Sequence, residues 1–176
     1  SHACGLGDRV APQIVRLMLL LKIQSLSYGN SGVQLATVQR LIDFYNADIL
    51  PVVFSQGSLG ASGDLAPLAN LSLPLLGLGE VMWHGHIIPA SEALDNMGWR
   101  PIDLQSKEGL ALLNGTQFMS AHAVDALIKA LRLSRQADKI AAMSLDAFDG
   151  RVDAFGDEVN RVRHHKGQIE TAKTVR

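Results

Sequence analysis

The sequence is poor in cysteine and in net charge, and it contains no long apolar run. Its one cysteine, Cys4, excludes a disulfide within the 176-residue chain. A chain without disulfides fits a reducing compartment, so we expect a cytoplasmic protein. We expect Cys4 itself to be a small buried apolar residue rather than a reactive thiol.

A net charge of -1 argues against nucleic acid or an anionic membrane surface as the main partner. No apolar run has the length of a membrane span, because Arg16 and Lys22 interrupt the run from Ile14 to Ile23. The composition is 47% hydrophobic and 19% charged, which is typical of a globular protein. With 176 residues, the chain is long enough for one domain with a substantial core.

Hydrophobic periodicity predicts a mainly α fold with one small β-hairpin. The hairpin is expected where two short apolar runs, 81–83 and 86–88, flank His84 and Gly85. The longest helix, 116–148, is apolar on most faces and is expected to be buried. A first shorter helix is predicted over 8–27, with Asp8 as its cap, and a second begins after a cap at Ser31. Further helices are predicted from Asp64 to about 77, over 91–96, over 106–113 and, more weakly, over 153–175. Residues 49–54 are predicted to be extended.

The most informative stretch is the glycine-rich segment Gly57–Leu68, which reads GSLGASGDLAPL. Three glycines within seven residues indicate a backbone with positive φ or a close approach to another group. Ser62 has only Ala61 and Gly63 beside it, so little side-chain bulk crowds its peptide groups. Asp64 stands at the N-cap position of the apolar helix that follows.

Three interpretations of this segment come from its residues alone. A phosphate-binding loop is disfavoured, because the Gly-Lys-Ser/Thr ending of a P-loop is absent and the match to a dinucleotide fingerprint is loose. A hydrolase nucleophile elbow fails, because Asp64 stands where the glycine after the serine is needed. A plain tight turn into a helix stays open.

Gly57–Ser72 closely resembles the signature of the aromatic amino acid ammonia-lyases, a family that includes histidine, phenylalanine and tyrosine lyases and related aminomutases. Lys107–Gln117, which reads KEGLALLNGTQ, resembles the second active-site segment of that family. Weaker similarity extends from Ser1 almost to Arg176. The resemblance implies that this chain is the MIO-bearing part of a larger all-α ammonia-lyase fold.

The resemblance implies a cofactor made from the chain itself, methylidene-imidazolone (MIO), formed from Ala61, Ser62 and Gly63. The Gly63 nitrogen would join the Ala61 carbonyl carbon, and Ser62 would lose water to leave an electrophilic alkene. Asp64 is interpreted either as a plain N-cap or as a residue that orients the cyclisation. No metal is expected.

Two residues of the second segment receive candidate roles from the resemblance. Asn114 would approach both MIO and the substrate, although Asn114-Gly115 also reads as a simple helix break. Gln117 is a candidate substrate-binding residue that alternatively caps or packs. His122, in the long helix, is expected to be a core or interface residue, and His84 and His86 are expected to be solvated turn residues.

The pair Ser1-His2 resembles histidine lyases, whereas His-Leu at this place resembles tyrosine lyases and Phe-Leu phenylalanine lyases. A second imidazole, that of His2, would hydrogen-bond the imidazole of L-histidine. Ser-His at a chain start also occurs as a vector remnant. The next residues, Ala3–Gly7, continue the family pattern without a gap, which favours native sequence.

These implications predict a carbon-nitrogen lyase that converts L-histidine to urocanate and ammonia. The alternatives are a phenylalanine or tyrosine lyase, an MIO aminomutase, and a non-catalytic fragment. By the resemblance, residues 1–176 form a single domain that lacks the family's extreme N-terminal segment, with its tyrosine base, and its C-terminal helical part. We expect a homotetramer with sites shared between subunits, a small amino acid as substrate, no nucleic-acid or membrane partner, and no turnover by residues 1–176 alone.

Overall fold

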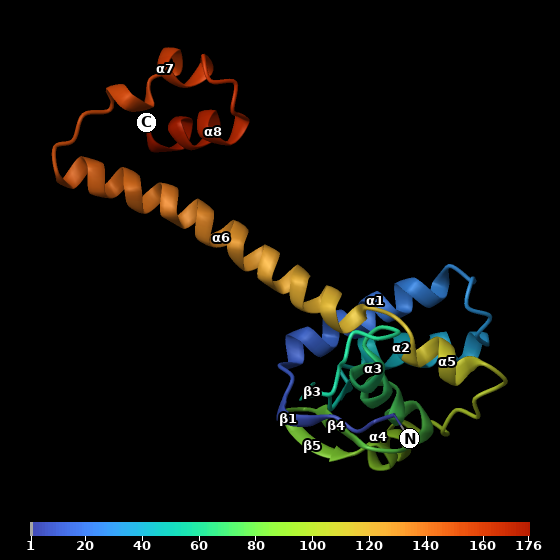
Figure 1. The fold of residues 1–176 in the computed structure, drawn as a ribbon. Helices are drawn as coiled ribbons and strands as arrows, with labels where there is room; N and C mark the ends of the chain where they lie inside the picture. Colours follow the sequence, from blue (N-terminus) through green and yellow to red (C-terminus); the bar gives the residue numbers. More distant parts are fainter. Residues whose placement is uncertain (1) are drawn as a thin grey trace. The chain divides into compact units, whose positions relative to one another are not determined.

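The computed structural model describes residues 2–176. The chain divides into two compact units, one ending at Val124 and the other spanning Asp125–Arg176, and each is described by itself (Figure 1).

Helices predominate, so the predicted mainly α class is confirmed, whereas the single-domain organisation stays a prediction. No helix among residues 2–176 combines the length and the apolarity needed to cross a membrane. The helices are α1 (Pro12–Ser27), α2 (Leu35–Asn46), α3 (Leu65–Ser72), α4 (Ala90–Met97), α5 (Glu108–Leu113), α6 (Gln117–Ala147), α7 (Asp157–Arg161) and α8 (Lys166–Val175), with 3-10 turns at Leu73–Leu76 and Asp153–Phe155.

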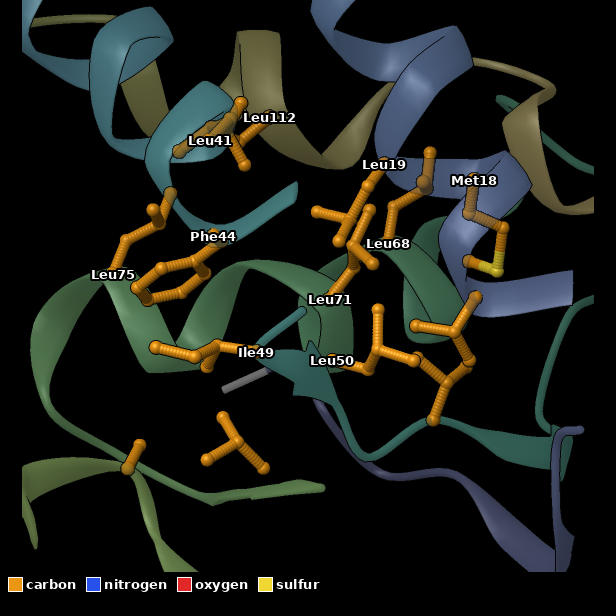
Figure 2. Packing of buried hydrophobic residues seen from close by; sticks show 14 of the residues in the cluster. Met18, Leu19, Leu41, Phe44, Ile49, Leu50, Leu68, Leu71, Leu75 and Leu112 are labelled. Carbon is orange, nitrogen blue, oxygen red and sulfur yellow. The ribbon is translucent and has the colours of Figure 1, made fainter. Parts of the chain in front are cut away.

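The core of the first unit lies where α1, α2 and α3 present their apolar faces to one another (Figure 2). Met18 and Leu19 of α1 are fully buried, as are Leu41 of α2 and Leu68 and Leu71 of α3. Burying side chains of this size stabilises a fold by roughly 1.5–3 kcal/mol each. The three helices therefore form a rigid base, and α3 lies between the strands and α5 in Figure 1.

The strands form two small antiparallel sheets rather than one hairpin. The predicted hairpin is confirmed as β4 (Glu80–Trp83) and β5 (His86–Pro89), and β2 (Leu50–Pro51) adds a third strand beside β4. Its turn has positive φ at both His84 (50°) and Gly85 (80°), which suits the twist of a two-residue hairpin loop. The second sheet pairs β1 (Leu6–Arg9) with β3 (Phe54–Gln56).

The predicted helix start at residue 8 is wrong, because residues 6–9 belong to strand β1. The strand pairs with β3, and the Val10 amide then donates to the Val53 carbonyl at 2.8 Å. Asp8 therefore does not cap a helix. The helix begins at Pro12, whose fixed φ and missing N–H suit a first helical position.

Helix α6 has the predicted length, but the expectation that it is buried is wrong. Ala121 is its one buried residue within the part of the chain that the structure describes. An apolar helix face is buried only where another element packs against it, and periodicity alone does not supply that element. The large exposed apolar side chains of α6 are Met119, Leu127, Ile128, Leu131, Leu133, Ile140 and Met143.

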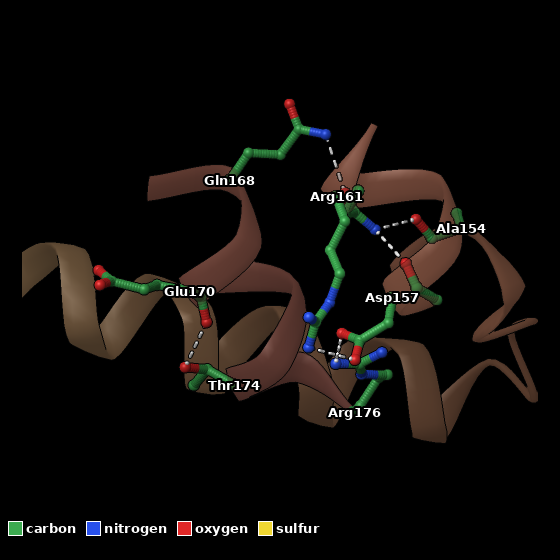
Figure 3. A network of polar contacts seen from close by, with 9 residues as sticks. Ala154, Asp157, Arg161, Gln168, Glu170, Thr174 and Arg176 are labelled. Atoms are coloured by element: carbon green, nitrogen blue, oxygen red, sulfur yellow. Dashed lines mark hydrogen bonds and ion pairs between the residues drawn. The ribbon is translucent and has the colours of Figure 1, made fainter. Parts of the chain in front are cut away.

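The second unit is held together by polar contacts between its short helices (Figure 3). Arg161 and Arg176 both donate to the carboxylate of Asp157, at 3.0 and 2.6 Å, and the hydrogen bond from Arg176 lowers the pKa of that carboxyl. Asn160 is buried and donates to the Gly156 carbonyl at 2.8 Å. The weakly predicted helical tail is confirmed as α7 and α8, broken by a turn.

Candidate functional site

The glycine-rich segment is a tight loop between β3 and α3. Its backbone has positive φ at Gly57 (128°), Gly60 (73°) and Gly63 (89°), as the glycine spacing predicts, and also at Ser62 (59°). Ser62 is unusual among these, because a residue with a Cβ disfavours this region. Ser62 and Ala61 are exposed at the turn. The loop therefore holds its Ala-Ser-Gly triplet in a compressed conformation that surrounding contacts must maintain.

The backbone brings the two sequence-predicted segments together. Gly63 pairs with Gly115 in an isolated parallel bridge, and the Asp64 amide donates to the Gly115 carbonyl at 2.8 Å. A Cβ on Gly63 would overlap the Gly115 carbonyl oxygen. Only glycine permits this approach, so the loop and the residue after Asn114 are fixed against each other.

Asp64 is fully buried and links the loop to the first turn of α6. One carboxylate oxygen accepts a hydrogen bond from the Ser58 hydroxyl, and the other accepts one from the Met119 amide, both at 3.0 Å. Asp64 occupies the N-cap position of α3, as predicted, but its side chain makes no capping bond there within residues 2–176. Its side chain thus orients the loop and α6, and its part in cyclisation stays a prediction.

Asn114 ends α5 and extends the chain towards Gly115. It has extended backbone geometry (ψ 136°), and its side-chain amide lies 3.4 Å from the Leu110 carbonyl. The interpretation as a helix break is therefore confirmed. Asn114 lines a pocket together with Lys107 and Leu110, not the pocket that Ala61 and Gly63 line, and its substrate-facing role stays a prediction.

Two buried charged residues that position α5 were missed by sequence reasoning. The first is Lys22 of α1, which is 1% exposed and donates to the carbonyls of Ala111 and Asn114, at 2.9 and 2.8 Å. Burial lowers the pKa of Lys22 from 10.5 to about 8, so the amine is still mostly protonated at pH 7. The sequence signal was a lysine inside a largely apolar helical run, an observation that excluded a membrane span but did not predict a buried contact.

The second is Glu108, the first residue of α5, which is 1% exposed. One of its oxygens accepts from the Gln34 amide and the Thr37 hydroxyl, and the other accepts from the Gln34 side chain and the Gln105 amide, all within 2.7–2.9 Å. Burial raises the pKa of Glu108, but these hydrogen bonds outweigh burial and hold it below its usual value. Helix α2 begins at Leu35 and not directly after Ser31 as expected, and the backbone amide of Gln34, its N-cap residue, donates to Glu108.

Replacing Glu108 by glutamine is expected to lower the free energy of unfolding by about 1.5–3 kcal/mol at pH 7, the range for hydrogen bonds to a charged group. The amide keeps one acceptor oxygen but turns an NH2 group towards groups that donate. The folded-state pKa lies below the unfolded one. The contribution of Glu108 is therefore complete above the unfolded pKa and disappears as pH falls through the folded pKa.

Chemical denaturation of wild type and Glu108→Gln at pH 7 and at acid pH measures this difference, which should shrink in acid. The exposed Glu92 of α4 gives the matched control, and Glu92→Gln is expected to stay within about 0.5 kcal/mol of wild type. An equal effect of both substitutions at pH 7 would contradict the role given to Glu108.

A pocket of about 180 Å³ lies beside the loop and is lined by His2 and Cys4 together with Ala61 and Gly63. Ligand pockets usually measure about 300–1,000 Å³, so this volume suits a small ligand or one part of a larger site. His2 also lines a second, mostly apolar pocket of about 220 Å³. Ser1 lies outside the described residues, and the expectation that Cys4 is buried is wrong, because it is exposed.

The other polar candidates lie as follows. The side-chain oxygen of Gln117 is buried against Gly115 and has no hydrogen-bond partner within residues 2–176, and its substrate-binding role stays a prediction. His122 is exposed, so the expectation of a core residue is wrong, and its ring makes an edge contact with that of Phe118, with centroids 4.7 Å apart. His84 and His86 are exposed at the hairpin turn. Residues 2–176 contain no group of three His, Cys, Asp or Glu side chains placed to hold a metal ion.

Comparison with known proteins gives consistent matches over the whole chain. A sequence model of the aromatic amino acid lyase family matches residues 1–176. Histidine ammonia-lyase from Geobacillus sp. (strain WCH70) is 48% identical over all 176 residues, which are 35% of that protein.

Solved structures of the same family superpose closely on this chain. Histidine ammonia-lyase from Trypanosoma cruzi superposes with a TM-score of 0.93 and 38% identity over 99% of this chain and 34% of that one. Tyrosine aminomutase from Streptomyces globisporus gives 0.93 and 34% identity over 99% of this chain and 33% of that one. The chain therefore spans about a third of the length of the proteins it matches.

Proposed function

Because this chain belongs to the aromatic amino acid lyase family, we propose that the whole protein eliminates ammonia from L-histidine without oxidation and releases urocanate. The observation that carries the choice of substrate is that His2 lines the same pocket as Ala61 and Gly63. Among solved structures, identity is 38% to a histidine lyase and 34% to an aminomutase, and histidine ammonia-lyases at 46% and 48% identity support the same choice. The shared fold does not separate these activities, because both kinds of protein superpose equally well.

The residues present fit an MIO group. Successive positive φ values at Ser62 (59°) and Gly63 (89°) compress the Ala61–Gly63 turn, and no bulky side chain stands within it. Ring closure would join the Gly63 nitrogen to the Ala61 carbonyl carbon with loss of one water, and Ser62 would lose a second. Once formed, the group supplies an electrophilic alkene.

The chain's own residues would hold and orient that site. Gly115 and Asp64 fix the loop through backbone contacts, so its geometry is set before substrate arrives. Asn114 precedes Gly115 and would place its amide beside the substrate. The His2 imidazole would form a hydrogen bond with the substrate imidazole, as donor or as acceptor. This bond would favour histidine over an aromatic side chain without ring nitrogens.

We also propose that the protein is a homotetramer with shared sites, located in the cytoplasm. The exposed apolar side chains of α6 support an association with further copies, because large apolar surfaces usually mark an interface. The small volume of the pocket beside the loop supports a site completed by other segments. Residues 1–176 by themselves are expected to show no turnover.

The substrate is tested by incubating the full-length protein separately with L-histidine, L-phenylalanine and L-tyrosine. Urocanate and ammonia are expected from L-histidine, with kcat/KM at least about tenfold higher than for the other two, the effect of one well-placed hydrogen bond. Preferential release of cinnamate or coumarate would contradict the assignment to histidine. A β-amino acid among the products would identify an aminomutase instead.

A further inference from the structure

We propose that Lys22 is a positioning residue, which holds Asn114 in register with the loop at Ala61–Gly63 by binding the carbonyl end of α5. Its importance for turnover rests on the proposed function, whereas the positioning itself does not. Lys22 lines neither of the pockets that His2 lines, and within residues 2–176 its ammonium makes no hydrogen bond to the loop. It acts through the backbone of Asn114, which it contacts at 2.8 Å.

Helix α5 cannot hold this register alone. It has six residues, which is well below the length at which an isolated helix is stable in water. Its last carbonyls also lack partners within the helix. Lys22 binds one of these carbonyls, that of Ala111, together with the carbonyl of Asn114, the residue that follows the helix, and it places a positive charge where the helix dipole is negative.

Lys22 is itself firmly placed. It lies three and four residues after Leu19 and Met18, so it shares the face of α1 that is buried in the core. Burying an ammonium group is costly unless its donors are satisfied. The carbonyls of Ala111 and Asn114 accept from two of its three N–H donors, so displacement of α5 would leave a buried charge without these partners.

A chain of short contacts connects Lys22 to the loop. Its ammonium binds the Asn114 carbonyl, the next residue Gly115 accepts from the Asp64 amide at 2.8 Å, and Gly115 pairs with Gly63. At the other end of α5, Glu108 is tied to α2. The two buried charges thus fix both ends of the helix that carries Asn114.

The test compares the full-length wild-type protein with Lys22→Met, which keeps an unbranched side chain but removes the donors. Amide hydrogen exchange, followed by mass spectrometry at pH 7, is expected to be at least about tenfold faster over residues 108–116 in the variant. Protection of α1 and α3 is expected to stay unchanged. The matched control is Lys139→Met, at an exposed lysine of α6, which should leave exchange over 108–116 as in wild type.

A kinetic split and a rescue complete the experiment. Lys22→Met is expected to lower kcat by about tenfold to a hundredfold with a smaller change in KM, and Lys22→Arg, which keeps charge and donors, is expected to restore part of the protection. Unchanged exchange over 108–116 would overturn the proposal. So would faster exchange throughout the core, because that would show a general structural role.

The two proposals fail separately. If the protein turns over no aromatic amino acid but Lys22→Met still loosens 108–116 alone, the proposed function fails and the positioning role stands. If the protein is an active lyase and Lys22→Met exchanges as Lys139→Met does, the positioning role fails and the function stands.

Discussion

Replacing Ser62 by alanine is expected to lower kcat/KM for L-histidine by at least about a thousand-fold in the full-length protein. The hydroxyl of Ser62 is the only group of the Ala61–Gly63 triplet that can leave as water to form an alkene. Without it, the chain's other residues can still bind and orient substrate but have no electrophile to present. We expect substrate binding to fall much less than turnover.

Intact mass gives a readout of the same substitution that does not depend on activity. The wild-type protein is expected to weigh two waters less than its encoded sequence, with the loss located at Ala61–Gly63. Ser62→Ala is expected to retain at least the water that the hydroxyl would supply. The control is Ser91→Ala, at an exposed serine of α4, which should keep both the mass loss and the activity.

Wild-type protein of unmodified mass that nevertheless releases urocanate would contradict the assignment of Ser62. Unmodified mass without turnover would instead favour the interpretation of the loop as a plain turn in a non-catalytic fragment. The two results are distinguishable in one preparation.

Local sequence signals predicted the parts of the fold that depend on neighbouring residues. Glycine spacing predicted the positive φ values of the loop, because glycine has no Cβ to exclude them. The pair His84-Gly85 between two apolar runs predicted the β4–β5 hairpin, which the observed register of Val81 with Ile88 confirms. The helical period predicted α3 and α4 in the same way.

Contacts between distant segments were beyond such signals. Strand β1 replaced the expected start of α1, because its partner β3 is more than forty residues further along the chain. Lys22 and Glu108 looked like ordinary charged residues, since their burial depends on where α1 and α2 meet α5. The apolar pattern of α6 indicated a helix correctly but did not say which surface would cover it.

In the candidate site, too, the sequence predicted the contiguous residues but not the contacts between distant segments. Ala61, Ser62, Gly63 and Asp64 were found because they lie in one contiguous segment that resembles the family signature, and the structure places them in one strained turn. That the Asp64 carboxylate would accept from Met119, rather than cap its own helix, could not be read from the sequence. It follows from the approach of α6 to the loop, which the Gly63–Gly115 contact makes possible.

The strongest structural effect is expected at that contact, from Gly63→Ala. A methyl group there would overlap the Gly115 carbonyl oxygen, which the Asp64 amide also binds. The new Cβ also meets a φ of 89°, which costs about 1–2 kcal/mol for a residue other than glycine. Together with an overpacking cost of about 1–3 kcal/mol, we expect the free energy of unfolding to fall by about 2–5 kcal/mol.

Gly85→Ala separates the two contributions, because Gly85 has a similar φ of 80° but nothing within 4 Å of an added Cβ. It should lose only the backbone cost, about 1–2 kcal/mol, and keep full activity and the mass loss at Ala61–Gly63. Gly63→Ala should lose activity by at least about a hundredfold and fail to show the mass loss, even where the protein is still folded. The reason is that the same contact that stabilises the fold holds the triplet in its compressed turn. Equal effects of the two substitutions on stability and mass would mean that the Gly63–Gly115 contact has no part in shaping the loop.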